Sequence, residues 1–144
     1  MRKLPILAAL LVLLAYAGPA LAEIGRIKSN VGTAAIDRGG RRLPVAPGVQ
    51  LEPGDVLVTG RDGRMGVTFA DGTRFAVGPD SRVTLTSFEY DRARQTGSFV
   101  TSVDRGSLGV VSGRIAKSRR DAMRVRTPTS MLGVRGTRFV IEVP

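Results

Sequence analysis

Three aspartates spaced nine residues apart constrain the fold of this chain more than any other feature. Asp62, Asp71 and Asp80 each stand at a short polar break, and the first two precede a glycine, which tolerates the positive φ of tight turns. Between the breaks, apolar and polar residues alternate with period two, as they do over residues 64–69. The pattern predicts half-buried strands joined by tight turns, either as a β-meander or as rungs of a short solenoid.

The rest of the chain shows the same punctuation, and no segment after the first 22 residues has a sustained helical period. The elements expected from it are one or two strands over residues 24–36, turns at 37–40 and 53–55, short strands over 98–103 and 107–111 around a turn at Asp104–Gly106, a basic loop over 113–121, and closing strands over 123–127 and 137–143. We therefore predict a single all-β domain, β-solenoid-like or β-sandwich-like.

The N-terminal segment predicts an export signal. A positive start (Arg2, Lys3) is followed by an apolar run over residues 4–17 and by an Ala-Leu-Ala tripeptide that ends at Ala22. The run of 14 residues is shorter than the ~20 needed to span a bilayer, which favours a cleaved signal over an uncleaved anchor. We expect cleavage between Ala22 and Glu23, so that residues 1–22 are a signal peptide and 23–144 form the domain.

Composition removes most catalytic chemistries from residues 23–144. The chain has no Cys and no His, which excludes thiolate catalysis, thiolate metal sites and the commonest general base. Carboxylates remain as acid–base groups, but those in turns are expected to accept backbone N–H bonds there. These turn residues are Asp55, Asp62, Asp71, Asp80 and Asp104. We predict no catalytic residue, metal site or cofactor, and a cryptic hydrolase built on two carboxylates is the least favoured interpretation.

A run of basic residues is the candidate ligand site. The net charge is +10, and +8 once Arg2 and Lys3 are removed with the signal. An exported protein would meet lipid head groups, lipopolysaccharide or cell-wall polymers rather than nucleic acid. The candidate anion-binding residues are Arg114, Lys117, Arg119, Arg120, Arg124 and Arg126. The run is consistent with an anion-binding edge, and equally with an edge strand that its charges protect against self-association.

The segment Thr127–Phe139 has an unusual composition. Pro128 forces the residue before it into an extended conformation and ends strand pairing there. Two glycines, Gly133 and Gly136, enclose a Val-Arg pair, which predicts a sharp turn with Arg135 inside it. Because turns flanked by glycine are mostly structural, a corner in which Arg135 bonds loop carbonyls is favoured over a ligand site.

With its T-P-x-x-x-x-x-V-R-G-T-x-F pattern, this segment resembles the signature of the FecR domain family, the periplasmic domain of ferric-citrate-type sensor proteins. Three earlier stretches also resemble family motifs: G-x-x-L-x-x-G-D-x-L-x-T over Gly48–Thr59, F-x-D-G-S/T over Phe69–Thr73, and x-G-x-L over Arg105–Leu108. The family-motif residues carried by the resemblance are Asp71, Gly72, Thr127, Pro128, Gly133, Val134, Arg135, Gly136, Thr137 and Phe139. The resemblance extends from about Ile24 to Val143.

The resemblance implies an envelope domain that binds or transmits rather than catalyses. In the best-known members, a cytoplasmic part controls a sigma factor, a helix crosses the inner membrane, and a C-terminal part contacts an outer-membrane receptor. This sequence matches none of those parts, so we do not carry sigma-factor regulation over. We expect a periplasmic or secreted, non-catalytic module that contacts an envelope protein, with no transmembrane segment after signal cleavage. The alternative is a binder or scaffold for an anionic polymer, cell wall or lipopolysaccharide.

Overall fold

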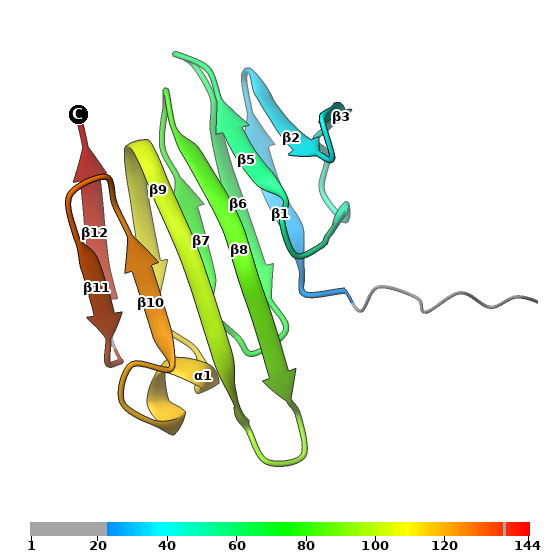
Figure 1. The fold of residues 1–144 in the computed structure, drawn as a ribbon. Helices are drawn as coiled ribbons and strands as arrows, with labels where there is room; N and C mark the ends of the chain where they lie inside the picture. Colours follow the sequence, from blue (N-terminus) through cyan, green and yellow to red (C-terminus); the bar gives the residue numbers. More distant parts are fainter. Residues whose placement is uncertain (1–22, 137) are drawn as a thin grey trace, which may run out of the picture.

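The computed structural model describes residues 23–136 and 138–144 (Figure 1). The expected signal peptide, including Ala22 at the cleavage site, lies outside these residues, as does Thr137 of the family motif. Signal cleavage therefore stays a prediction. Within the described ranges, no helix is both long enough and apolar enough to cross a membrane.

Short strands account for most of the described chain, and the prediction of an all-β domain is confirmed. In chain order the elements are β1 (Gly25–Val31), β2 (Ala34–Arg38), β3 (Arg41–Pro44), β4 (Gln50–Leu51), β5 (Val56–Thr59), β6 (Arg64–Phe69), β7 (Arg74–Val77), β8 (Arg82–Asp91), β9 (Thr96–Val111), α1 (Arg114–Ser118), β10 (Met123–Arg126), β11 (Met131–Val134) and β12 (Arg138–Val143). Of the one or two strands expected over residues 24–36, the structure has two, β1 and β2, and β2 continues to Arg38.

The strands form one curled sheet that folds over into two facing layers (Figure 1). One layer has the order β3-β2-β5-β8-β9-β10-β11, and the other has the order β4-β1-β6-β7-β9-β12. The β9–β10 pair is parallel, and the other pairs of the described strands are antiparallel. Of the two expected architectures, the structure is therefore the sandwich-like one.

Strand β9 belongs to both layers, and the predicted turn at Asp104–Gly106 is wrong. Its first part pairs with β8 and β10, and its last part pairs with β7 and β12, so neighbours on both sides keep the backbone extended. Gly106 marks the passage between layers with a φ of 91°. A Cβ there would lie 2.5 Å from the Cα of Ser81, so only glycine fits this crossing.

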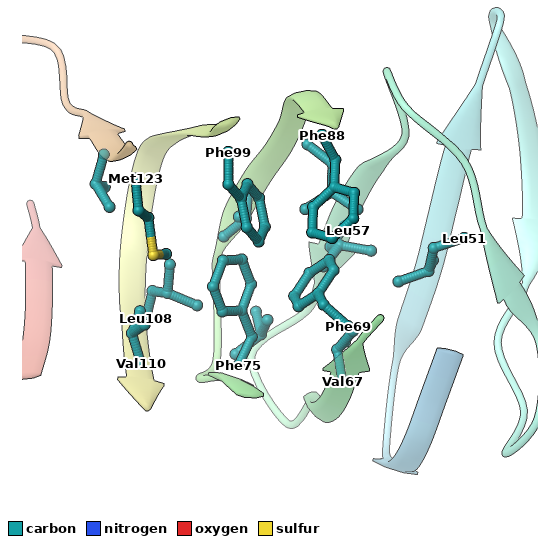
Figure 2. Close-up of a cluster of buried hydrophobic side chains, with 14 of the residues drawn as sticks. Leu51, Leu57, Val67, Phe69, Phe75, Phe88, Phe99, Leu108, Val110 and Met123 are labelled. Carbon is teal, nitrogen blue, oxygen red and sulfur yellow. The ribbon is translucent and has the colours of Figure 1, made fainter. Parts of the chain in front are cut away.

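Four phenyl rings fill the centre of the sandwich (Figure 2). Phe69 and Phe75 point inward from one layer, and Phe88 and Phe99 point inward from the other. The ring of Phe99 is completely buried, with centroids 4.8, 5.6 and 4.9 Å from those of Phe69, Phe75 and Phe88. These edge-to-face and stacked contacts hold the two layers together.

The nine-residue series of aspartates does mark turns, since Asp62, Asp71 and Asp80 lie in the β5–β6, β6–β7 and β7–β8 connections. Glycine was expected in these turns because it tolerates a positive φ, and Gly72 has one, of 89°. This reason does not hold at Gly63, which has no positive φ. There, a Cβ would collide with the carbonyl oxygen of Thr33, so close backbone approach is what requires glycine.

Two further predictions for the C-terminal part need correction. The basic loop expected over residues 113–121 contains the short helix α1. The sharp turn expected between Gly133 and Gly136 falls later, because Gly133 and Val134 belong to β11 and pair with β10. The chain leaves one layer at Arg135 and Gly136 and enters the other layer with β12.

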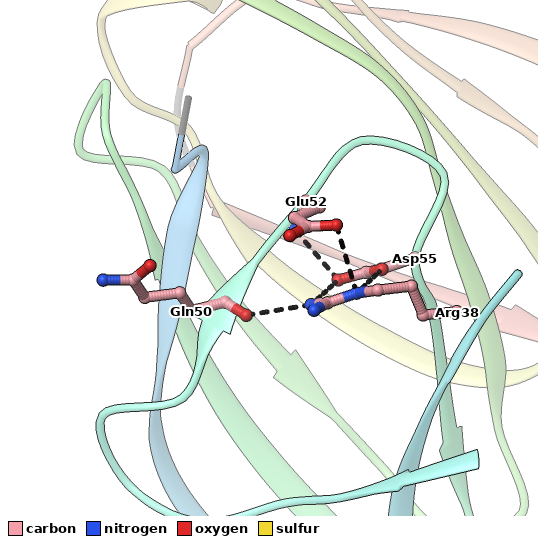
Figure 3. A network of polar contacts seen from close by, with 4 residues as sticks. All are labelled: Arg38, Gln50, Glu52 and Asp55. Atoms are coloured by element: carbon pink, nitrogen blue, oxygen red, sulfur yellow. Dashed lines mark hydrogen bonds and ion pairs between the residues drawn. The ribbon is translucent and has the colours of Figure 1, made fainter. Parts of the chain in front are cut away.

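A partly buried ion pair holds the corner between β4 and β5 (Figure 3). The Asp55 carboxylate is fully buried and accepts two hydrogen bonds of 2.8 Å from Nε and Nη2 of Arg38. It also accepts the backbone N–H of Glu52 at 2.8 Å, while Arg38 donates to the carbonyl of Gln50 at 3.1 Å. The bond to Asp55 raises the pKa of Arg38. The aspartate of the Gly54-Asp55 pair, in the motif over Gly48–Thr59, therefore has a structural role.

Candidate functional site

The turn between β6 and β7 anchors the segment that leads into α1. Asp71 is 1% exposed, and its carboxylate accepts hydrogen bonds from the backbone N–H and the hydroxyl of Thr73, at 3.0 and 2.8 Å. A third bond, of 3.2 Å, comes from the backbone N–H of Ile115 in α1. The backbone carbonyl of Asp71 accepts the N–H of Arg114 at 3.0 Å. Asp71 therefore joins two segments that are more than forty residues apart.

Gly113 allows these two segments to meet. Its N–H donates to the Thr73 hydroxyl at 3.1 Å. A Cβ on Gly113 would lie 2.6 Å from the carbonyl oxygen of Asp71 and 2.8 Å from the carbonyl carbon of Gly72. Both of these atoms are backbone atoms, so a side chain at position 113 would push the turn and α1 apart. The motif turn and the start of α1 form one rigid unit.

An open hollow of about 680 Å³ lies beside this unit. It is lined by the β6–β7 turn, the first residue of β7, the β8–β9 turn, the end of β9 and α1. Four exposed cations from these elements line it, namely Arg74, Arg94, Arg114 and Lys117. Asp71 is the one carboxylate in the lining, and its two oxygens already accept three hydrogen bonds. The hollow is therefore electropositive.

Most of these cations have no carboxylate partner. Arg94 makes a 3.9 Å ion pair with Asp91, whereas Arg74, Arg114 and Lys117 make none among the described residues. Four arginines elsewhere in the sandwich are paired with carboxylates, namely Arg26, Arg38, Arg42 and Arg82, while the other cations outside the hollow form no ion pair among the described residues. The hollow thus gathers cations whose charge the protein itself does not neutralise.

The charge is unevenly distributed along the sequence as well. Residues 105–144 contain nine Arg or Lys and two carboxylates, against eleven and ten in residues 23–104. Almost all of the net charge of the domain is therefore carried by its last forty residues. A running sum of charge along the sequence would have revealed this excess, which the apparent scatter of the arginines conceals.

The structure divides the six predicted anion-binding residues. Arg114 and Lys117 lie in the hollow. Arg119 and Arg120 are exposed in the connection after α1. Arg124 and Arg126 both project from the outer face of β10. The four groups outside the hollow therefore form no single site with it. Arg74 and Arg94, which complete the hollow, come from distant parts of the sequence and were not predicted.

Most of the family-motif segment Thr127–Phe139 forms the outer strands at one side of the sandwich. Its first residues make a turn in which the N–H of Ser130 donates to the Thr127 hydroxyl at 3.1 Å. Arg135 is exposed, and its side chain donates to no loop carbonyl within the described ranges. The segment therefore builds an edge and a crossing between layers, without the fixed arginine that the sequence predicts.

This side of the sandwich is open. Strand β11 pairs only with β10, and β12 pairs only with β9, among the described strands. Leu132 lies in register with the buried Val125 and so faces between the layers, yet it is 43% exposed. Met131 and Val140 are 47% and 68% exposed. We refer to β11, β12 and these three apolar side chains as the open edge.

A family model described as FecR protein matches residues 55–143. The match runs from the corner before β5 to the end of β12, and it includes the open edge and every residue that lines the electropositive hollow. No curated protein and no solved structure matches the chain.

Proposed function

The chain belongs to the FecR family of envelope-associated signalling and regulatory proteins, and from this premise we propose that it is a non-catalytic module that contacts an envelope protein through its open edge. Signalling domains of this family interact with proteins. The observation that carries the proposal is the pair of unpaired strands, β11 and β12, with exposed apolar side chains on both.

An unpaired strand offers a row of N–H and C=O groups to an incoming extended segment. Such strands are usually protected by charge, bulges or a covering loop. Here Leu132 and Val140 instead leave apolar surface uncovered next to the free backbone. Burial of this surface would add roughly 25 cal/mol per Å² to the main-chain hydrogen bonds of a docked strand. The edge therefore suits an extended partner segment with alternating apolar residues.

The charges around the open edge favour an acidic partner. Arg126 ends β10, Arg135 stands in the crossing, and Arg138 begins β12, and all three are exposed. None of the three forms an ion pair among the described residues. Opposite charges across an interface mainly increase the association rate and the specificity. The proposed partner is a periplasmic or membrane-attached protein whose docking segment carries Asp or Glu beside its apolar residues.

The proposed location depends on the N-terminal segment. A positive start, an apolar run of 14 residues and the Ala-Leu-Ala tripeptide support export through a signal peptide. The domain would then meet its partner in the periplasm. N-terminal sequencing of the protein recovered from the envelope fraction would test this, with Glu23 expected as the first residue.

Crosslinking in cells tests the contact itself. A photoreactive amino acid at Leu132 is expected to give a discrete adduct with one envelope protein. The same amino acid at Arg41, on the opposite edge of the same layer, is the control and should give none. Adding Val140→Asp should reduce the Leu132 adduct at least tenfold, because a carboxylate would then stand at the apolar surface and repel the acidic segment. Equal adducts at both positions, or an adduct that Val140→Asp leaves unchanged, would contradict the proposal.

A further inference from the structure

We infer that the electropositive hollow beside α1 is a binding site for an anion that carries two or more phosphate groups. This goes beyond the protein contact at the open edge. None of the four cations Arg74, Arg94, Arg114 and Lys117 lies on β11 or β12. The hollow is lined in part by α1, and Figure 1 shows α1 at one end of the sandwich.

The first argument is electrostatic. Four like charges from three elements, namely β7, the β8–β9 turn and α1, converge on one hollow, and their repulsion opposes folding. Among the described residues, Arg94 alone of the four has a carboxylate partner, Asp91 at 3.9 Å, and the one carboxylate in the lining, Asp71, is engaged with Thr73 and Ile115. Concave sites lined by one sign of charge concentrate ions of the opposite sign. A bound anion would replace the missing carboxylates.

The second argument is geometric. Asp71 fixes the backbone of Arg114 and Ile115 against the β6–β7 turn, while Arg74 is held by the pairing of β7 with β9. The backbones that carry two of the cations are therefore in place before any ligand arrives. Such preorganisation reduces the ordering cost of binding.

The third argument concerns the class of anion. Three of the four cations are arginines, whose planar guanidinium donates two parallel hydrogen bonds to phosphate oxygens. The cations come from separate walls of a hollow of about 680 Å³, which is far larger than a single phosphate. One phosphate would engage one wall only. A ligand with two or more phosphates reaches cations on separate walls, whether it is a soluble molecule or the head group of a lipid.

Titration calorimetry with sodium tripolyphosphate tests the inference on the protein purified after expression of the full chain. Binding is expected at low salt and should weaken as salt is raised, because the charges are exposed. The variant Arg74→Gln with Arg114→Gln should bind at least tenfold more weakly. The matched control, Arg124→Gln with Arg126→Gln, removes the same charge from the outer face of β10 and should change the affinity less than threefold.

Two further measurements complete the test. Tripolyphosphate should raise the melting temperature of the wild type and of the control variant, but not that of the hollow variant, Arg74→Gln with Arg114→Gln. Without ligand, the hollow variant should melt no lower than the wild type. Flotation with phosphatidylcholine vesicles containing cardiolipin, whose head group carries two phosphates, asks whether a lipid serves as the ligand. If the hollow variant alone loses binding of a probe, the site is supported, and the probe that binds shows whether the ligand is a soluble anion or a lipid. Equal losses in both variants, or binding of neither probe, would overturn it.

Discussion

The substitution Asp71→Asn tests whether the motif turn holds α1 in place. The amide keeps the shape of the carboxylate and can still accept the N–H of Thr73, but its NH₂ group then faces the N–H of Ile115, which loses its acceptor. A buried N–H without a partner costs about 1–3 kcal/mol, and the loss of charge weakens the remaining bonds. We expect about 2–4 kcal/mol of lost stability. For a domain of this size that corresponds to a fall of roughly 10 °C in melting temperature, measured by circular dichroism.

The matched control is Asp80→Asn, the same chemical change at the next turn of the nine-residue series. Asp80 is exposed, has a φ of 50°, and its side chain makes no hydrogen bond among the described residues. Asparagine tolerates a positive φ, so the melting temperature should change by less than about 2 °C. If Asp71→Asn also melts within about 2 °C of the wild type, the anchoring role assigned to Asp71 is refuted.

Three further predictions concern the fold. Gly106→Ala should destabilise by about 2–4 kcal/mol in urea unfolding, and Gly72→Ala by only about 1 kcal/mol, because both have a positive φ but only Gly106 lacks room for a Cβ; equal losses would contradict this. Arg38→Ala should cost roughly 3–5 kcal/mol, since it leaves a buried carboxylate unpaired, and a loss below 1 kcal/mol would argue against the ion pair. The hydrogen bond from Arg42 lowers the pKa of Asp37 in the folded protein. The ionised Asp37 therefore stabilises the fold above its ordinary pKa of 3.8, and this stabilisation is lost as the pH falls through the lowered pKa. The difference in melting temperature between the wild type and Asp37→Asn should shrink from pH 6 to pH 2.

The strands and most turns could be predicted because their causes are local. In β6 the alternation of apolar and polar residues corresponds to the observed alternation of buried and half-buried side chains. The Asp-Gly pair at residues 71–72 supplies the turn that its φ requires. Neither feature depends on anything outside its own segment.

The course of β9 could not be read from its own residues. Asp104, Arg105 and Gly106 have the composition of a turn, but pairing with β8 before this point and with β7 and β12 after it keeps the strand continuous. Strand pairing between distant segments overrides local turn preference because several main-chain hydrogen bonds depend on it. For the same reason β11 was missed, since its pairing with β10 decides its conformation.

The hollow, too, combines residues that the sequence could indicate with residues that only the fold brings together. The basic run identified Arg114 and Lys117, since both lie in one short segment. Arg74 and Arg94 entered the site only when the β6–β7 and β8–β9 turns met α1 at one end of the sandwich. Nothing in their own neighbourhoods distinguishes them from other exposed arginines.

By itself, the sequence determined the class of fold, the likeness to the FecR family and the excess of positive charge near the C-terminus, because alternation, motifs and charge are properties of neighbouring residues. The tertiary structure alone decided which cations share a hollow, which strands end without a neighbour, and which aspartate carries a buried anchor. These properties depend on contacts between segments far apart in the chain, and the free energy of such contacts exists only once both segments are in place.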